Sequence, residues 1–258
     1  MLVELVESKG SDLHLTVGAP PTVRLDGGLR HLPGYAPLRP ADTEELLRAA
    51  ATPEQWHRFE QTRELDFAYS IAGLSRFRVN VYAQRGSCSA VFRVIPHDIK
   101  PLEELGVPDA VARSAQLHRG LVLVTGPTGS GKTTTLAGLV DLANRTRHAH
   151  IVTIEDPIEF LHEHRCSLVN QREVGADTGS FPTALKHALR QDPDIILVGE
   201  LRDLETTATA LTAAETGHLV LATLHTQSAA QTIDRIVDIF SSHQQHQIRA
   251  QLSALRSR

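Results

Sequence analysis

The residues best suited to chemistry lie in one short stretch, in which three glycines precede a lysine and a threonine. The stretch fits the pattern G-x-x-x-x-G-K-S/T, which ends here at Lys132 and Thr133. Its members are Gly126, Pro127, Thr128, Gly129, Ser130, Gly131, Lys132, Thr133 and Thr134. In such a loop, glycines let backbone N–H groups surround phosphate oxygens, the lysine reaches the β- and γ-phosphates, and the hydroxyl binds Mg²⁺. The motif therefore predicts a nucleotide site with Mg²⁺.

Two elements must flank this loop if it is to hold phosphate. Leu121–Val124 is a short apolar run that suits a buried parallel strand. After the loop, apolar residues recur at helical spacing, namely Leu136, Leu139, Val140 and Ala143. A helix that begins at the loop presents the positive end of its dipole to the phosphates. A glycine-rich turn that binds nothing is the alternative, and the strand, motif and helix in register argue against it.

Three further candidate residues follow predicted strands. From residue 120 onward strands and helices alternate, which is typical of a parallel sheet covered by helices. Ligands of such sheets bind beyond the carboxyl ends of the strands, where Glu155, Glu200 and His225 occur. Glu200 is the candidate that polarises water or, with Thr133, holds Mg²⁺, and Glu155 is the second carboxylate for the same task. His225 is a candidate γ-phosphate sensor or bridge to a neighbouring subunit, and a structural histidine is the alternative.

Residues 1–96 have the pattern of a smaller α+β domain. Alternating residues predict strands near 12–16, 22–25, 65–69, 76–82 and 89–95. Helix-start patterns predict helices near 42–50 and 53–61. On the fourth of these strands Arg76 and Arg78 share one face. A solvated strand face is the ordinary interpretation, whereas a phosphate-binding face would use the planar fork of each arginine.

The boundary between the two domains is marked by prolines. Residues 96–118 contain three prolines around one short polar helix, and a proline cannot donate to a strand ladder. We therefore predict a first domain of residues 1–96, a linker and hinge of 97–118, and a second domain of 119–258.

Composition excludes several classes of protein. The 26 basic and 30 acidic residues leave a net charge of −4, which gives no overall basic balance for nucleic acid. No apolar run approaches the roughly 20 residues of a membrane helix, and the N-terminus does not resemble a signal peptide.

Two cysteines bound the metal and redox chemistry of the chain. Cys88 and Cys166 form no C-x-x-C pair, which excludes a tetracysteine zinc site. We expect reduced thiols in a cytosolic protein, with a disulfide as the alternative. His162, His164 and Cys166 alternate as metal ligands could, although a polar loop explains them more simply.

Five motifs resemble those of the type II/type IV secretion ATPases. In order they are the glycine-rich loop, 154–159 (Ile-Glu-Asp-Pro-Ile-Glu), 170–174 (Asn-Gln-Arg-Glu-Val), 192–203 and 216–226. They resemble the Walker A motif, Asp box, Walker B motif and His box of that family. The segments 11–15, 75–80 and 90–93 also resemble the N-terminal domain of its twitching-motility branch, the pilus-retraction ATPases. Pilus-assembly and type II secretion ATPases usually carry a tetracysteine zinc element and a longer N-terminal region, so the retraction branch is favoured.

The resemblance implies a PAS-like domain followed by a RecA-like P-loop ATPase domain, assembled into a homohexamer. ATP would bind Lys132 and Thr133, and Arg76, Arg78 or Arg93 would close on it from the N-terminal domain. The implied function is an ATP-hydrolysing motor for type IV pilus retraction. Peripheral association with an inner-membrane pilus platform protein, at the cytoplasmic face of the inner membrane, is implied as well. No nucleic acid is expected as a partner.

Retraction ATPases continue into a C-terminal helical segment with an Ala-Ile-Arg-Asn-Leu-type motif, and this chain stops at Arg258 before it. We therefore expect a fragment, a truncated gene product or a degenerate copy. Two further hypotheses stay open: a nucleotide-binding assembly subunit with little turnover, and a nucleic-acid-translocating RecA-like ATPase. The acidic balance argues against the second of these.

Overall fold

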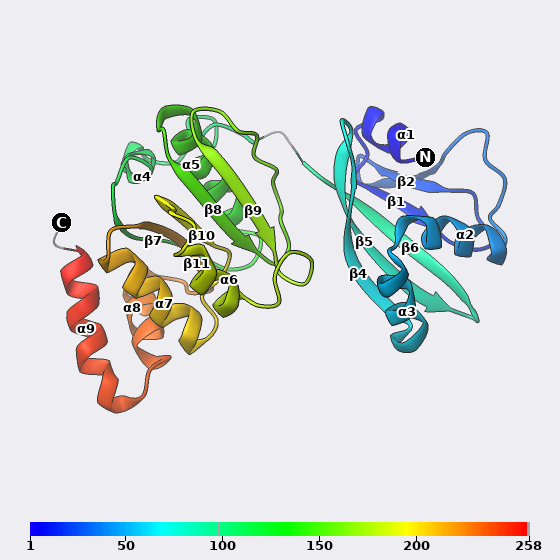
Figure 1. Ribbon diagram of the computed structural model, residues 1–258. Coiled ribbons are helices and arrows are strands. Elements are labelled where there is room, and N and C mark those ends of the chain that lie inside the picture. The colour runs from blue at the N-terminus through cyan, green and yellow to red at the C-terminus, as the bar shows by residue number, and fades with distance from the viewer. Residues whose placement is uncertain (97–98, 257–258) are drawn as a thin grey trace. The chain divides into compact units, whose positions relative to one another are not determined.

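The computed structural model describes residues 1–96 and 99–256, and the chain divides into two compact units, Met1–His97 and Asp98–Arg258 (Figure 1). Each unit has its own sheet and its own buried core. The boundary is predicted to follow residue 96. The next residue, His97, lies outside the described residues. Among the residues that are described, no helix is both long and apolar enough to cross a membrane.

The first unit is built on a six-stranded antiparallel sheet in the order β3-β2-β1-β6-β5-β4. Its strands are β1 (Asp12–Leu15), β2 (Thr22–Leu25), β3 (Gly28–His31), β4 (Glu64–Ile71), β5 (Ser75–Gln84) and β6 (Ser87–Ile95). Its helices are α1 (Leu2–Glu7), α2 (Pro40–Ala50) and α3 (Pro53–Thr62). The sequence does not predict α1 or β3. All four β3 residues are exposed, so the strand has no buried alternation to reveal it.

The burial of β5 follows its sequence alternation. Phe77 and Val79 are fully buried, whereas Arg78 and Asn80 are exposed and Arg76 is half-buried. The predicted shared face of the two arginines is therefore correct, because successive side chains of a strand point to opposite faces.

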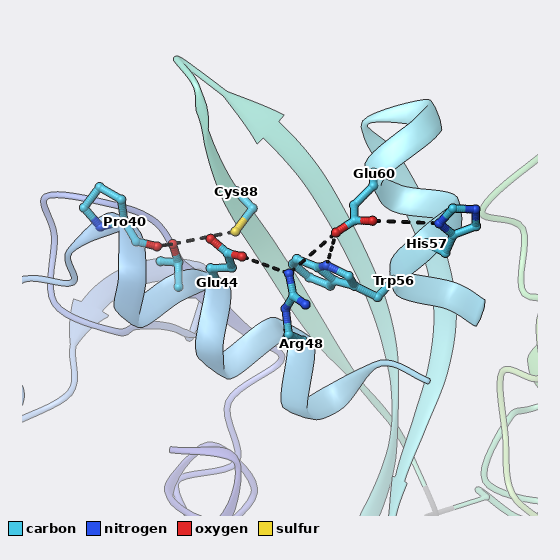
Figure 2. A network of polar contacts seen from close by, with 8 residues as sticks. Pro40, Glu44, Arg48, Trp56, His57, Glu60 and Cys88 are labelled. Atoms are coloured by element: carbon cyan, nitrogen blue, oxygen red, sulfur yellow. Dashed lines mark hydrogen bonds and ion pairs between the residues drawn. The ribbon is translucent and has the colours of Figure 1, made fainter. Parts of the chain in front are cut away.

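Helices α2 and α3 are joined by a polar network (Figure 2). The Arg48 guanidinium lies 4.8 Å from the centre of the Trp56 ring and pairs with Glu44 at 3.0 Å and Glu60 at 3.5 Å. The Trp56 Nε1–H group donates to Glu60 at 2.9 Å. A stacked guanidinium and a satisfied indole favour a fixed helix pair at the surface of this unit.

The two helix starts predicted in the first unit, those of α2 and α3, differ from each other. The Thr52 hydroxyl accepts a hydrogen bond from the Gln55 backbone N–H, and the Gln55 side-chain oxygen accepts one from the Thr52 backbone N–H. The predicted capping box is therefore present. In α2 the predicted starting residue Asp42 is instead the third residue of the helix. Its carboxylate accepts from the backbone and side chain of Arg39, and these hydrogen bonds lower the pKa of Asp42 to about 2.

The second unit is built on a parallel sheet in the order β7-β11-β10-β8-β9. Its strands are β7 (Gly120–Thr125), β8 (His150–Glu155), β9 (Leu168–Glu173), β10 (Ile195–Val198) and β11 (Leu219–Leu224). Its helices are α4 (Asp109–Ser114), α5 (Lys132–Thr146), α6 (Phe181–Ala188), α7 (Leu204–Glu215), α8 (Ala229–Asp238) and α9 (Ser242–Arg256). Figure 1 shows helices α5 to α9 arranged around this sheet. The alternating α/β fold expected from residue 120 onward is confirmed.

The segment predicted as a linker packs against the second unit over its described residues, 99–118. Leu102 and Ala115 are each 1% exposed and share a core with Leu139 and Val140 of α5. A methyl group at Gly138 of α5 would come within 2.7 Å of the Leu102 side chain. The glycine therefore lets this segment approach the helix closely.

Replacement of Leu102 by alanine tests this packing. We expect Leu102→Ala to destabilise the second unit by about 2–5 kcal/mol, because it leaves a cavity in a close-packed core. Hydrogen exchange of buried α5 amides measures the change. The exposed neighbour supplies the matched control, Glu103→Ala, which should shift stability by no more than about 0.5 kcal/mol. Equal exchange in the two variants would contradict the packing.

Candidate nucleotide-binding site

The glycine-rich loop connects β7 to α5. Its glycines have positive φ angles, with Gly129 at +78° and Gly131 at +87°. Residues with a side chain rarely adopt such angles, so the loop conformation requires glycine there. A methyl group at Gly126 would lie 2.5 Å from the Ser130 hydroxyl, so this glycine also permits a close approach. The curled backbone at the start of α5 is the geometry that receives phosphate.

The Lys132 ammonium lies over this loop. Its Nζ atom donates to the backbone carbonyls of Gly126 and Pro127, each at 2.9 Å. It also lies 3.4 Å from Nδ1 of His225, which follows β11. The lysine thus links the loop to the end of a second strand.

Most of the predicted residues of the second unit line one cavity of about 630 Å³, whereas Gly126, Pro127 and Ser130 do not line it. Its lining includes the predicted residues Thr128, Gly129, Gly131, Lys132, Thr133, Thr134, Glu155, Glu200 and His225. It also includes residues that the sequence did not assign to the nucleotide site, among them Asp156, Glu159, Phe160, His162, Phe181 and Arg202. The cavity is bounded by both apolar and ionisable side chains, as nucleotide sites commonly are.

Glu200 is held by two basic side chains. Arg202 Nε donates to its Oε2 at 2.7 Å, and His225 Nε2 lies 3.4 Å from Oε1. Because Lys132 can only donate, Nδ1 of His225 is the acceptor in this contact, and the other ring nitrogen faces Glu200. His225 therefore bridges the carboxylate and the loop lysine. The sequence did not predict a role for Arg202, although this residue is only two positions from Glu200.

Glu155 has a different environment. It is buried, and its Oε1 accepts hydrogen bonds from Thr153 Oγ1 at 2.6 Å and from Gln171 Nε2 at 3.1 Å. Burial raises the pKa of Glu155, and these two hydrogen bonds oppose that rise. The sequence missed Thr153 and Gln171. Thr153 had a signal, because it shares a face of β8 with Glu155 at a spacing of two.

The donor set of this cavity fits Mg²⁺. The Thr133 hydroxyl and the Glu200 carboxylate both line it. Oxygen donors of this kind are those that Mg²⁺ takes, together with water and phosphate oxygens.

His162, His164 and Cys166 are not arranged as ligands of a metal ion in the described part of the chain. Within residues 1–96 and 99–256, no group of three His, Cys, Asp or Glu side chains is arranged to hold a metal ion. His164 Nδ1 accepts from the Val169 backbone, and Cys166 Sγ donates to the Arg145 carbonyl. Both cysteines are free thiols, as expected.

Arg76, Arg78 and Arg93 belong to the first unit. Arg78 on β5 is paired in register with Arg93 on β6, and both line a cavity of about 440 Å³ in that unit. Arg93 Nε donates to Asp12 Oδ1 at 2.8 Å. Burial would raise the pKa of Asp12, but hydrogen bonds from Ser11 and Arg93 lower it. A guanidinium pair of this kind is suited to an anion.

Comparison with known proteins identifies the family. The model of the family described as "Type II/IV secretion system protein" matches residues 57–257. The chain is also 53% identical to the type IV pilus retraction ATPase PilT of Pseudomonas aeruginosa over 243 residues. This aligned stretch covers 94% of this chain and 70% of that protein. The chain belongs to the type II/IV secretion system protein family.

Two further relatives agree with this assignment. The twitching motility protein of Neisseria gonorrhoeae is 47% identical over 233 residues, which are 90% of this chain and 62% of that protein. The crystal structure of the pilus retraction motor PilT with bound ADP has a TM-score of 0.91 and 52% identity, over 98% of this chain and 74% of that one. The resemblance to secretion ATPases is therefore confirmed, as is the fold class of a RecA-like P-loop domain preceded by a smaller α+β domain.

Removal of the loop lysine tests the site. We expect Lys132→Ala to reduce nucleotide binding or phosphate release by about a hundredfold, because it removes the cation that reaches the phosphates. Titration with a fluorescent ATP analogue and a phosphate-release assay measure the two effects. The matched control is Lys186→Ala on the exposed side of α6, which should change neither. Full activity of a folded Lys132→Ala variant would contradict the assignment.

Proposed function

We propose that this chain is an ATP-hydrolysing motor subunit that powers retraction of type IV pili. The observation that carries the proposal is the single cavity that unites the glycine-rich loop with Glu155, Glu200 and His225. The named functions of the relatives, pilus retraction and twitching motility, support it.

ATP binds in this proposal with its phosphates against the loop and Lys132. The Thr133 hydroxyl and Glu200 hold Mg²⁺, directly or through water, and the ion neutralises charge on the β- and γ-phosphates. Glu200 polarises the attacking water, and Glu155 is the second carboxylate for that task. His225 bridges Glu200 and Lys132, so it senses whether the lysine is engaged with a γ-phosphate.

The motor acts as a homohexamer at the cytoplasmic face of the inner membrane, attached through a pilus platform protein. Arg76, Arg78 or Arg93 of a neighbouring subunit stabilises charge on the transferring phosphoryl group. Nucleic acid is not a substrate. Phosphate release measured with and without single-stranded DNA, across protein concentration, tests this set of statements. We expect turnover to rise with protein concentration and to be unchanged by single-stranded DNA. Binding without turnover would favour an assembly subunit, and DNA-stimulated turnover would favour a nucleic-acid motor.

The two carboxylates can be separated by isosteric changes. We expect Glu200→Gln to keep ATP bound but to lower kcat by about a hundredfold or more, because an amide cannot act as a base or bind Mg²⁺ strongly. Glu155→Gln should impair turnover less. Single-turnover and steady-state kinetics of both variants measure the difference. Greater damage from Glu155→Gln would exchange the two roles.

The arginine face can be tested by mixing subunits. We expect Arg76→Ala/Arg78→Ala to lower turnover far more than ATP affinity, by about a thousandfold if these are arginine fingers. Inactive Lys132→Ala subunits, which keep both arginines, should then restore activity when mixed with the double variant.

The matched control for that experiment is Arg30→Ala/Arg58→Ala, which removes two exposed arginines elsewhere on the first unit. It should leave turnover unchanged. Sedimentation must accompany the kinetics, since rescue needs mixed rings. Mixed rings without rescue would count against a site shared between subunits.

A further inference from the structure

Strand β9 contributes the Gln171 side chain, which lies within the motif 170–174 but has no role in the mechanism above. The Gln171 amide makes three hydrogen bonds. Its Nε2 donates to Glu155 Oε1 at 3.1 Å and to the Phe160 carbonyl at 2.9 Å, while its Oε1 accepts from the His162 backbone at 2.8 Å. One side chain therefore joins the buried carboxylate at the end of β8 to the loop that follows it.

The partners fix which way round this amide stands. The His162 N–H group can only donate, so it requires the amide oxygen. The Phe160 carbonyl can only accept, so it requires the amide nitrogen. The second proton of that nitrogen then faces Glu155. No carboxylate and no apolar side chain of the same length can satisfy all three partners at neutral pH.

The loop that Gln171 anchors forms part of the cavity wall. Residues 156–162 include Asp156, Glu159 and Phe160, all of which line the cavity beside the glycine-rich loop. Glu173, two positions after Gln171 on the same face of β9, accepts from the Ile158 backbone at 3.0 Å. Side chains of β9 thus hold the backbone of this loop at residues 158, 160 and 162.

Glu155 is held from two strands at one oxygen. Thr153 of β8 and Gln171 of β9 both donate to Oε1, and their backbones are directly paired in register. Two donors that converge on one carboxylate oxygen restrict rotation of the carboxylate. A catalytic group must be held to within a fraction of an ångström, which is the usual task of such outer partners.

We propose that Gln171 is a positioning residue of the nucleotide site: its amide fixes both the Glu155 carboxylate and the 156–162 wall of the cavity. The proposal rests on the ATPase function proposed above. It assigns Gln171 an effect on the rate of phosphoryl transfer, with little effect on nucleotide affinity, because the amide lies behind the groups that contact the reacting phosphate.

Two substitutions test the proposal. Gln171→Met removes all three hydrogen bonds at nearly constant length. Gln171→Glu keeps the acceptor for His162, and so keeps the loop attached, but it places an oxygen against Glu155 and the Phe160 carbonyl. We expect each to lower kcat by about tenfold to a hundredfold, while KM and the Kd for ADP stay within about threefold. Gln61→Met, on the exposed surface of α3, is the matched control and should match the wild type.

The outcomes separate a positioning role from others. Unchanged kcat in either folded variant would overturn the inference, as would equal losses of kcat and ADP affinity, which indicate general damage to the fold. If Gln171→Met does not fold, Gln171→Glu decides alone, because it retains the loop anchor. Wild-type protein that binds ADP but releases no phosphate would instead overturn the proposed function and the inference with it.

Discussion

The site depends on the register of the parallel sheet. Ile154, Val198 and Ala222 lie side by side on β8, β10 and β11, so the chain leaves these strands at one edge. A shift of one residue would turn each following side chain to the opposite face. Since β7 ends at the same edge, that register brings the glycine-rich loop, two carboxylates and a histidine to a single cavity. The chemistry is therefore a product of strand pairing as much as of residue type.

The same edge gives its two carboxylates unlike surroundings. Glu155 is buried behind hydroxyl and amide donors, whereas Glu200 is partly exposed and lies between a guanidinium and an imidazole. Burial raises the pKa of Glu155, whereas Glu200 is ion-paired with Arg202. Pairs of acids in contrasting environments are a common basis for dividing roles in proton transfer. His225 lies 3.4 Å from the Lys132 ammonium and 3.4 Å from the Glu200 carboxylate.

Much of this arrangement follows from local sequence. The glycine-rich loop was predictable because its backbone angles permit few residues other than glycine, and Glu155, Glu200 and His225 because each directly follows an apolar run. Gln171 and Arg202 lie within the motifs 170–174 and 192–203, but their roles were not predictable, since their partners come from tertiary pairing that a single sequence does not display. Strand β9 was not predicted for a related reason. It is an edge strand, and several of its residues are exposed or half-buried. The three prolines of 96–118 indicated a linker, whereas the burial of Leu102 depends on a distant glycine of α5.

The contact between Leu102 and Gly138 has a mechanical consequence. Helix α5 begins at Lys132 of the glycine-rich loop, and its second turn packs against Leu102 of the segment 99–118. Interiors packed this closely transmit displacement with little compression. A small axial shift of α5 during exchange of one nucleotide for another would therefore push directly on that segment. Gly138 is therefore the point at which a movement of α5 would reach Leu102 and the segment that contains it.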